Sequence, residues 1–188
     1  MSSLCYIQAR GGSKRFPMKA LALWNGIPML GDAIQKAQAT GLFDYIVVSS
    51  DSPEILQVAH DYGAMPLWRT AEASSDTATD DDVAREVLQY FPNAETVCKL
   101  YPCVPLLKKF TLWQAVNYCI NFGKSVYLVD KTGKDSGTFY IFNYQQFRKD
   151  LTIGLTTFPW VKMCSRDQEC QDINTPEDLE IAKQKAGK

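Results

Sequence analysis

A short segment near the N-terminus combines glycine with concentrated positive charge. It reads Gln8-Ala9-Arg10-Gly11-Gly12-Ser13-Lys14-Arg15-Phe16-Pro17-Met18-Lys19, with four cations within ten residues. Glycines let backbone N–H groups approach a ligand closely, and the cations would neutralise an anion. The segment therefore predicts a phosphate-binding loop, although a basic glycine loop can also be solvated and carry no function.

This loop differs from the two common nucleotide-binding motifs. Neither G-x-G-x-x-G nor G-x-x-x-x-G-K-[ST] occurs in it. The first absence disfavours a dinucleotide fold of the dehydrogenase type, and the second disfavours a P-loop. If the loop binds phosphate, it does so in another structural setting.

Apolar runs rich in β-formers alternate along the chain with segments of helical periodicity. We expect strands at residues 4–9, 45–49, 65–68, 96–101, 125–129, 138–142 and 158–163. Helical spacing covers residues 30–37 with Gly41 as the stop, and residues 53–62, 84–91 and 112–119. Thr175-Pro176-Glu177-Asp178 is a capping box that opens a C-terminal helix. The alternation predicts an α/β fold with a mostly parallel sheet flanked by helices.

The segment from Thr70 to Asp82 is polar and lacks apolar periodicity. We expect a long loop here, of the kind that often forms a lid or the rim of a site. It carries four acids, Asp76, Asp80, Asp81 and Asp82, which could suggest a metal site. Negative charge in the first turn of a helix is the simpler interpretation.

Ligands of open parallel sheets bind beyond the carboxyl ends of the strands. This rule points to residues 10–19, 49–51, the 70s loop, 101–105 and 172–174. Two of these positions also have a purely structural interpretation. Asp51 lies in Ser50-Asp51-Ser52-Pro53, which is good helix-start chemistry, and Asp172 and Asn174 can simply end a strand and prepare the cap at Thr175.

Length and charge limit the classes of protein. The chain has 188 residues, 46% of them hydrophobic, with 20 basic and 21 acidic side chains and a net charge of −1. We expect one domain over residues 1–188, large enough to bury a core without disulfides or structural metal. The near-neutral charge argues against nucleic acid or an anionic membrane as a partner. No long apolar stretch or secretory layout is present, so we expect a cytoplasmic protein.

Cysteine and histidine offer little catalytic chemistry. The six cysteines contain no Cys-x-x-Cys pair and have no neighbouring histidine, so we expect buried reduced thiols and no zinc. His60 is the single histidine and lies within a helical pattern, where we expect it at the surface. Histidine-based nucleophilic catalysis is therefore disfavoured.

Several segments together resemble a known family. Residues 7–19 resemble the nucleotide-binding signature of the acylneuraminate cytidylyltransferases, the CMP-sialic-acid type. Residues 172–179, Asp-Ile-Asn-Thr-Pro-Glu-Asp-Leu, are similar to the metal-binding segment of that family. Asp135-Ser136-Gly137-Thr138-Phe139-Tyr140 resembles a stretch of its pseudaminic acid branch, and residues 41–44 and 47–51 match in order and position. The resemblance runs from about residue 4 to 182.

The resemblance implies a Rossmann-like nucleotidyltransferase fold and a Mg²⁺-dependent reaction. A cytidylyl group would pass from CTP to a nine-carbon acidic sugar of the pseudaminic or sialic acid type, releasing pyrophosphate. Catalytic roles would fall to Arg10, Lys19 and Asp172, with Mg²⁺ held by Asp172 and Asn174. The nucleotide would be bound by Ala9, Arg10, Gly11, Gly12, Ser13, Lys14, Arg15, Lys19 and Asp51. Tyr101, Asp135 and Tyr140 would contact the sugar, and a homodimer is an option because family members usually form dimers.

The chain departs from this family mainly on the sugar side. Ala20 stands where family members commonly have asparagine, and Tyr101-Pro102-Cys103-Val104-Pro105 replaces a segment with more hydroxyl groups. The stretch between Val129 and Asp135 is shorter than the corresponding family segment. Two alternatives therefore stay open. One is a degenerate homologue that binds nucleotide or sugar without turnover, and the other is a nucleotidyltransferase for a different sugar, as in spore-coat polysaccharide synthesis.

Overall fold

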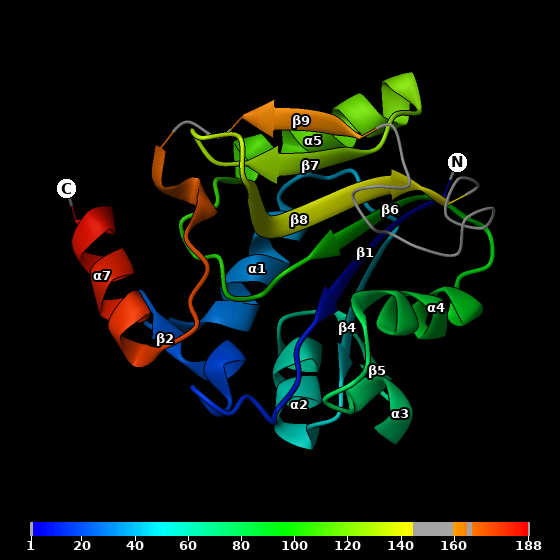
Figure 1. Ribbon diagram of the computed structural model, residues 1–188. Helices are drawn as coiled ribbons and strands as arrows, with labels where there is room; N and C mark the ends of the chain where they lie inside the picture. Colours follow the sequence, from blue (N-terminus) through cyan, green and yellow to red (C-terminus); the bar gives the residue numbers. More distant parts are fainter. Residues whose placement is uncertain (1, 145–159, 165–166, 188) are drawn as a thin grey trace.

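The computed structural model describes residues 2–144, 160–164 and 167–187. Seven strands form one sheet in the order β5-β4-β1-β6-β8-β7-β9 (Figure 1). These strands are β1 (Ser2–Gln8), β4 (Tyr45–Ser50), β5 (Met65–Trp68), β6 (Ala94–Leu100), β7 (Val126–Val129), β8 (Asp135–Asn143) and β9 (Val161–Cys164). Only β8 runs against its neighbours, β6 and β7, and the other pairs are parallel. The predicted mostly parallel α/β fold is confirmed.

Helices cover both faces of the sheet. The larger hydrophobic cluster is covered by α1 (Met29–Gln38), α2 (Pro53–Asp61), α5 (Lys109–Phe122) and α7 (Pro176–Ala186). The second cluster lies under α4 (Asp80–Tyr90), which follows the short α3 (Ala71–Ser74). Smaller elements are the ribbon of β2 (Leu23–Trp24) and β3 (Ile27–Pro28) and the 3-10 turns η1 (Lys19–Leu21) and η2 (Asp167–Cys170).

The inner strand β1 contributes side chains to the hydrophobic clusters on both faces of the sheet. Cys5 and Ile7 belong to the larger cluster, whereas Leu4 and Tyr6 belong to the cluster under α4. Because side chains of a strand alternate between its two faces, a continuous apolar run is the pattern of a strand covered on both sides. All four side chains are fully buried.

The prediction of one long loop at residues 70–82 is wrong. Thr70 caps α3, and Thr79 with Asp82 forms a capping box at the start of α4. A four-residue helix and the first turn of a longer one are stabilised mainly by polar caps. They are too short to show an apolar periodicity in the sequence. The helix-start interpretation is confirmed for Asp80, Asp81 and Asp82, which occupy the first turn of α4. It is wrong for Asp76, which precedes that helix.

Other element boundaries also differ from prediction. The helix α1 ends at Gln38, three residues before Gly41, whose left-handed φ of 64° lies in the following turn. β8 begins at Asp135 and not at Thr138, because its first residues pair with β7. β9 starts at Val161; residues 158 and 159 of the expected strand lie outside the described part of the chain.

Four cysteines and the histidine lie where they were expected, and Cys164 and the half-buried Cys170 do not. All six cysteines are free, and four of them are buried. Cys164 is exposed, against the expectation of buried thiols, because it ends the edge strand β9. The His60 side chain is 74% exposed, as predicted.

Gly31 of α1 packs against the ring of Tyr62, the residue that follows α2. A Cβ at this position would lie 2.5 Å from Cε1 of Tyr62. Overpacking of this kind costs about 1–3 kcal/mol, against a gain of up to about 1 kcal/mol from replacing a helical glycine. We expect Gly31→Ala to lower the free energy of unfolding by about 1–2 kcal/mol, measured by urea denaturation. Gly12→Ala, where a Cβ meets no heavy atom within 4 Å, is the control, and equal losses in both variants would contradict the argument.

Candidate functional site

The glycine loop follows β1 and closes on itself. The Gly11 carbonyl oxygen accepts hydrogen bonds from the Ser13 N–H (3.1 Å) and the Met18 N–H (3.3 Å). The Gly11 N–H donates to Asp51 Oδ1 at 2.9 Å. A Cβ on Gly11 would lie 3.1 Å from Cβ of Ser52, so the close approach of the loop to the start of α2 favours glycine.

These contacts give Asp51 a structural position. Asp51 follows β4, and its carboxylate accepts the hydrogen bond of the Gly11 N–H. A phosphate-binding loop would use this N–H to bind the ligand. Asp51 therefore fixes the loop against the neighbouring strand end. The nucleotide contacts expected of Asp51 and Gly11 stay predictions.

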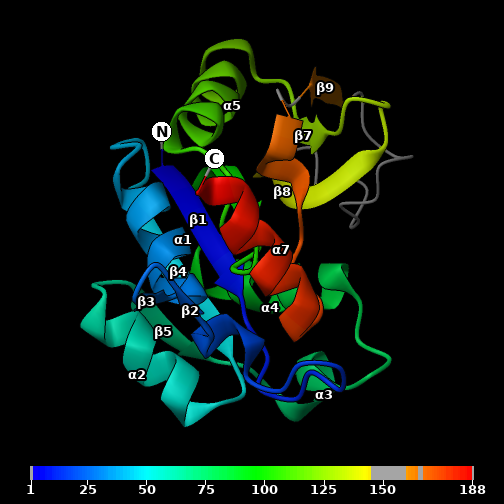
Figure 2. The same cartoon turned by 90° about the vertical axis from the view of Figure 1, so that its left-hand side faces the viewer.

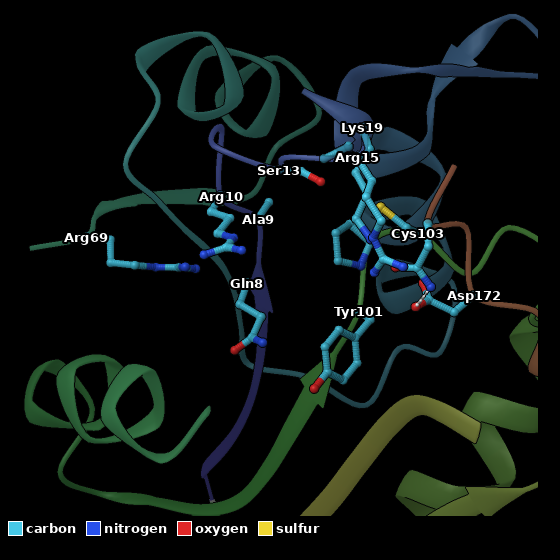
Figure 3. A pocket seen from close by; sticks show the side chains of 13 residues that line it. Gln8, Ala9, Arg10, Ser13, Arg15, Lys19, Arg69, Tyr101, Cys103 and Asp172 are labelled. Carbon is cyan, nitrogen blue, oxygen red and sulfur yellow. Dashed lines mark hydrogen bonds between the residues drawn. The ribbon is translucent and has the colours of Figure 1, made fainter. Parts of the chain in front are cut away.

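A cavity of about 300 Å³ lies beyond the ends of β1 and β6 (Figure 3). Its lining contains eight of the predicted site residues: Ala9, Arg10, Ser13, Arg15, Lys19, Tyr101, Asp172 and Asn174. In Figure 3, Arg10 and Arg69 lie to the left, and Arg15, Lys19 and Asp172 lie to the right. The lining thus brings four cations and one carboxylate around a single space, which suits a polyanionic ligand and its counter-ion.

Lys19 joins this loop to the segment before α7, which lies beside it in Figure 1 and Figure 2. Its Nζ donates to the Ile173 carbonyl oxygen (2.9 Å) and to Asn174 Oδ1 (3.2 Å). Asn174 Nδ2 in turn donates to Asp172 Oδ2 at 2.8 Å. Burial raises the pKa of Asp172, and the positive charge of Lys19 opposes that rise. Asn174 therefore links the ammonium to the carboxylate, and its predicted role as a metal ligand stays a prediction.

Two of the predicted loop cations pair with an acid from the α3–α4 connection. Asp76 contacts Lys14 Nζ at 2.8 Å and Arg10 Nη1 at 3.3 Å. Lys14, by its hydrogen bond and its charge, holds the pKa of Asp76 below its usual range. All three side chains are largely solvent-exposed, so these ion pairs contribute little stability. Lys14 and Gly12 are not among the residues that line the cavity.

The predicted sugar-contacting residues form a connected group. Tyr140 Oη donates to Asp135 Oδ2 at 2.5 Å, and the ring centroids of Tyr140 and Tyr101 lie 6.3 Å apart. Only Tyr101 of the three lines the cavity. Asp135 and Tyr140 therefore lie behind Tyr101, one strand further along the sheet.

Sequence reasoning missed Arg69, Gln8 and Lys99. Arg69 directly follows β5, is 5% exposed, and donates from Nη2 to the Ser49 carbonyl oxygen at 2.6 Å. A second cavity of about 220 Å³ adjoins the first, and the two share Gln8, Arg10 and Arg69. The strand-end rule could have found Arg69, and a lysine inside a buried strand was a visible signal for Lys99.

The described part of the chain contains no cluster of three or more His, Cys, Asp or Glu side chains that could hold a metal ion. None of the described helices has the length and apolar character needed to span a membrane.

The mostly parallel sheet, with a basic glycine loop and a carboxylate beyond its strand ends, is the arrangement of an α/β protein suited to phosphate-bearing ligands. A family model described as cytidylyltransferase matches residues 4–149. The chain is 31% identical over 223 aligned residues to pseudaminic acid cytidylyltransferase from Campylobacter jejuni subsp. jejuni serotype O:2, with 97% of this chain and 95% of that protein covered. The chain therefore belongs to the cytidylyltransferase family, and the resemblance drawn from its sequence is confirmed.

Further relatives agree with this membership. N-acylneuraminate cytidylyltransferase A from Danio rerio is 32% identical over 142 residues, which cover 76% of this chain and 30% of that protein. The solved structure of CMP:2-keto-3-deoxy-manno-octonic acid synthetase complexed with CTP superposes with a TM-score of 0.79 at 14% identity, covering 100% and 99% of the two chains. A cytidylyltransferase structure from Leptospira borgpetersenii serovar Hardjo-bovis gives a TM-score of 0.75 at 20% identity, covering 97% and 85%. The two structures support the fold alone.

Proposed function

We propose that this protein transfers a cytidylyl group from CTP to a nine-carbon acidic sugar, giving CMP-sugar and pyrophosphate. The observation that carries the proposal is the single cavity that Arg10, Arg15, Lys19 and Asp172 line together. Family membership and the 31% identity to a pseudaminic acid cytidylyltransferase supply the substrate class. Pseudaminic acid is therefore the first substrate to test.

The reaction balances without a further reagent. The anomeric hydroxyl oxygen of the sugar forms a bond to the α-phosphorus of CTP, and the bond from that phosphorus to the bridging α–β oxygen breaks. Pyrophosphate leaves with the bond electrons, and the hydroxyl proton passes to solvent. Such chemistry depends mostly on positioning and on neutralising charge, which Arg10, Arg15 and Lys19 would supply at the phosphates.

We further propose that Asp172 would hold Mg²⁺. The ion is commonly bound by one or two carboxylates together with substrate phosphates, and the half-buried Asp172 carboxylate in the cavity lining fits that donor set. When bound, Mg²⁺ would neutralise triphosphate charge. Asn174 would keep Lys19 and Asp172 in position, as its hydrogen bonds to both suggest.

The sugar side carries the departures from the family. Burial raises the pKa of Cys103 to about 12, so this cavity residue presents a neutral thiol. The 223 positions aligned to the Campylobacter relative exceed the 188 residues of this chain, so the relative has residues that this chain lacks. The choice of sugar, the cytoplasmic location and the homodimer stay predictions.

Pyrophosphate release with CTP, Mg²⁺ and pseudaminic acid tests the proposal. We expect release that requires both the sugar and CTP, with N-acetylneuraminic acid and the other nucleoside triphosphates as comparisons. Release that prefers another triphosphate would contradict the cytidylyl assignment and leave the fold intact. Thermal stabilisation by CTP with no release from any sugar would instead support the degenerate binding homologue.

A further inference from the structure

The carboxylate of one of the protein's own side chains, Asp80, lies at the edge of the candidate site. Asp80, the first residue of α4, accepts hydrogen bonds from Gln8 Nε2 and from Tyr101 Oη, each at 2.7 Å. The Lys99 ammonium forms an ion pair with the same carboxylate. Gln8 and Tyr101 also line the 300 Å³ cavity. The hydrogen-bond donors that hold Asp80 therefore border this cavity.

Lys99 is a buried cation that needs an anionic partner. Its side chain is 1% exposed, and Nζ lies 4.5 Å from the ring centroid of Tyr101 and 5.1 Å from that of Tyr140. Burial lowers the pKa of Lys99, while the negative charge of Asp80 opposes that shift. An ammonium left unpaired in such surroundings is strongly destabilising, so a carboxylate must stay beside Lys99.

Asp80 borders solvent, and a competing carboxylate would have to replace its contacts with Gln8, Tyr101 and Lys99. Its side chain is 48% exposed, so rotation into solvent requires no repacking of the core. A carboxylate in the first turn of a helix also remains favoured by the helix dipole after it leaves Lys99. Exchange of Asp80 for another carboxylate would therefore keep Lys99 paired and Asp80 solvated.

The surroundings of Lys99 offer more hydrogen bonding than Asp80 uses. Tyr6 Oη and Gln8 Oε1 are buried and have no hydrogen-bond partner among the described residues. Tyr6 lies directly opposite Lys99 in the register of β1 and β6. Buried polar groups are nearly always paired. The Tyr6 hydroxyl can donate to a carboxylate oxygen, whereas Gln8 Oε1 only accepts and would need a donor such as a sugar hydroxyl. The two atoms therefore indicate a polar site that Asp80 fills incompletely and that suits a carboxylate borne on a hydroxylated ligand.

We propose that Lys99, Tyr101 and Gln8 bind the carboxylate of the acidic sugar, and that Asp80 occupies this site when no sugar is bound. The inference rests on the proposed function, because it names the group by which that substrate is recognised. In such sugars the carboxylate is attached to the anomeric carbon, which also bears the attacking hydroxyl. A carboxylate beside Tyr101 would place that hydroxyl at the cavity that Tyr101 shares with Lys19. A neutral sugar has no group that can replace Asp80.

Calorimetric titration can test this exchange without turnover. The ligands are pseudaminic acid and its C1 amide, and each titration contains α,β-methylene-CTP, whose α–β linkage cannot be cleaved. We expect the wild-type protein to bind the acid at least about tenfold more tightly than the amide, and Lys99→Met to lose that preference. Asp80→Asn, which removes the competing charge, should bind the acid about threefold more tightly or better. Glu177→Gln, which removes one exposed acid from the first turn of another helix, α7, is the matched control.

The outcomes separate exchange from a fixed structural ion pair. Equal preference for the acid in wild type and Lys99→Met, or weaker acid binding by Asp80→Asn, would overturn the carboxylate site. Thermal stabilisation by α,β-methylene-CTP shows which variants are folded. Asp80→Asn leaves Lys99 unpaired until the acid binds, so if that variant is not folded, the acid-over-amide preference of Lys99→Met decides. If Lys99→Met is not folded, the Asp80→Asn affinity decides. If the expected affinities are found but no pyrophosphate is released from CTP, the proposed function fails while the carboxylate site stands. If the acid is turned over but neither variant changes its affinity, the carboxylate site fails while the proposed function stands.

Discussion

Replacing Lys19 by methionine is expected to lower turnover with CTP at least about 100-fold, the loss that follows removal of one preorganised charge from a reaction site. The Lys19 ammonium is held in the cavity by the Ile173 carbonyl oxygen and by Asn174 Oδ1. Methionine keeps an unbranched apolar stem and removes only the charge. The measurement is kcat from pyrophosphate release at saturating CTP and sugar.

The matched control for this prediction is Lys183→Met. Lys183 lies on α7, is exposed, and pairs only with Glu180 in the preceding turn among its described contacts. The Lys183→Met substitution removes the same charge from the surface of α7. Turnover of Lys19→Met close to that of Lys183→Met would remove Lys19 from the mechanism. Thermal melting of both variants shows whether a loss comes from unfolding.

The sheet was predictable because burial leaves a direct mark on the sequence. The central strand is covered by α1 on one face and α4 on the other, so residues 4–7 are all apolar. The same signal located β4, β6 and β7 to within two residues. It failed at α3, where four residues held by the Thr70 cap are too few to show a helical period.

The candidate site was predictable only where its residues are close in sequence. Arg10, Ser13, Arg15 and Lys19 were found because one loop contains them and the strand-end rule locates that loop. The contact of Lys19 with Asn174 spans 155 positions, so no local spacing encodes it. The resemblance to a family supplied both ends of that contact and left its geometry open.

Acids near the loop were the hardest to interpret from sequence. The cluster from Asp76 to Asp82 looks uniform, yet its members do different things. Asp82 caps a helix, Asp76 pairs with Arg10 and Lys14, and Asp80 pairs with the buried Lys99. The net charge of −1 therefore conceals opposed charges that meet at the edge of the cavity. Tertiary pairing, which sequence spacing does not report, decides the role of each acid.

Replacing Asp172 by asparagine is expected to lower turnover at least about 100-fold and to move the Mg²⁺ dependence to higher concentration, because a neutral amide binds this hard cation more weakly than a carboxylate does. The substitution keeps the size of the side chain beside Asn174. The measurement is kcat as a function of Mg²⁺ at saturating CTP, with Glu177→Gln, an exposed acid in the first turn of α7, as the control. Low turnover with an unchanged Mg²⁺ dependence would assign Asp172 to positioning Lys19 through Asn174. Turnover close to that of Glu177→Gln would exclude Asp172 from the reaction.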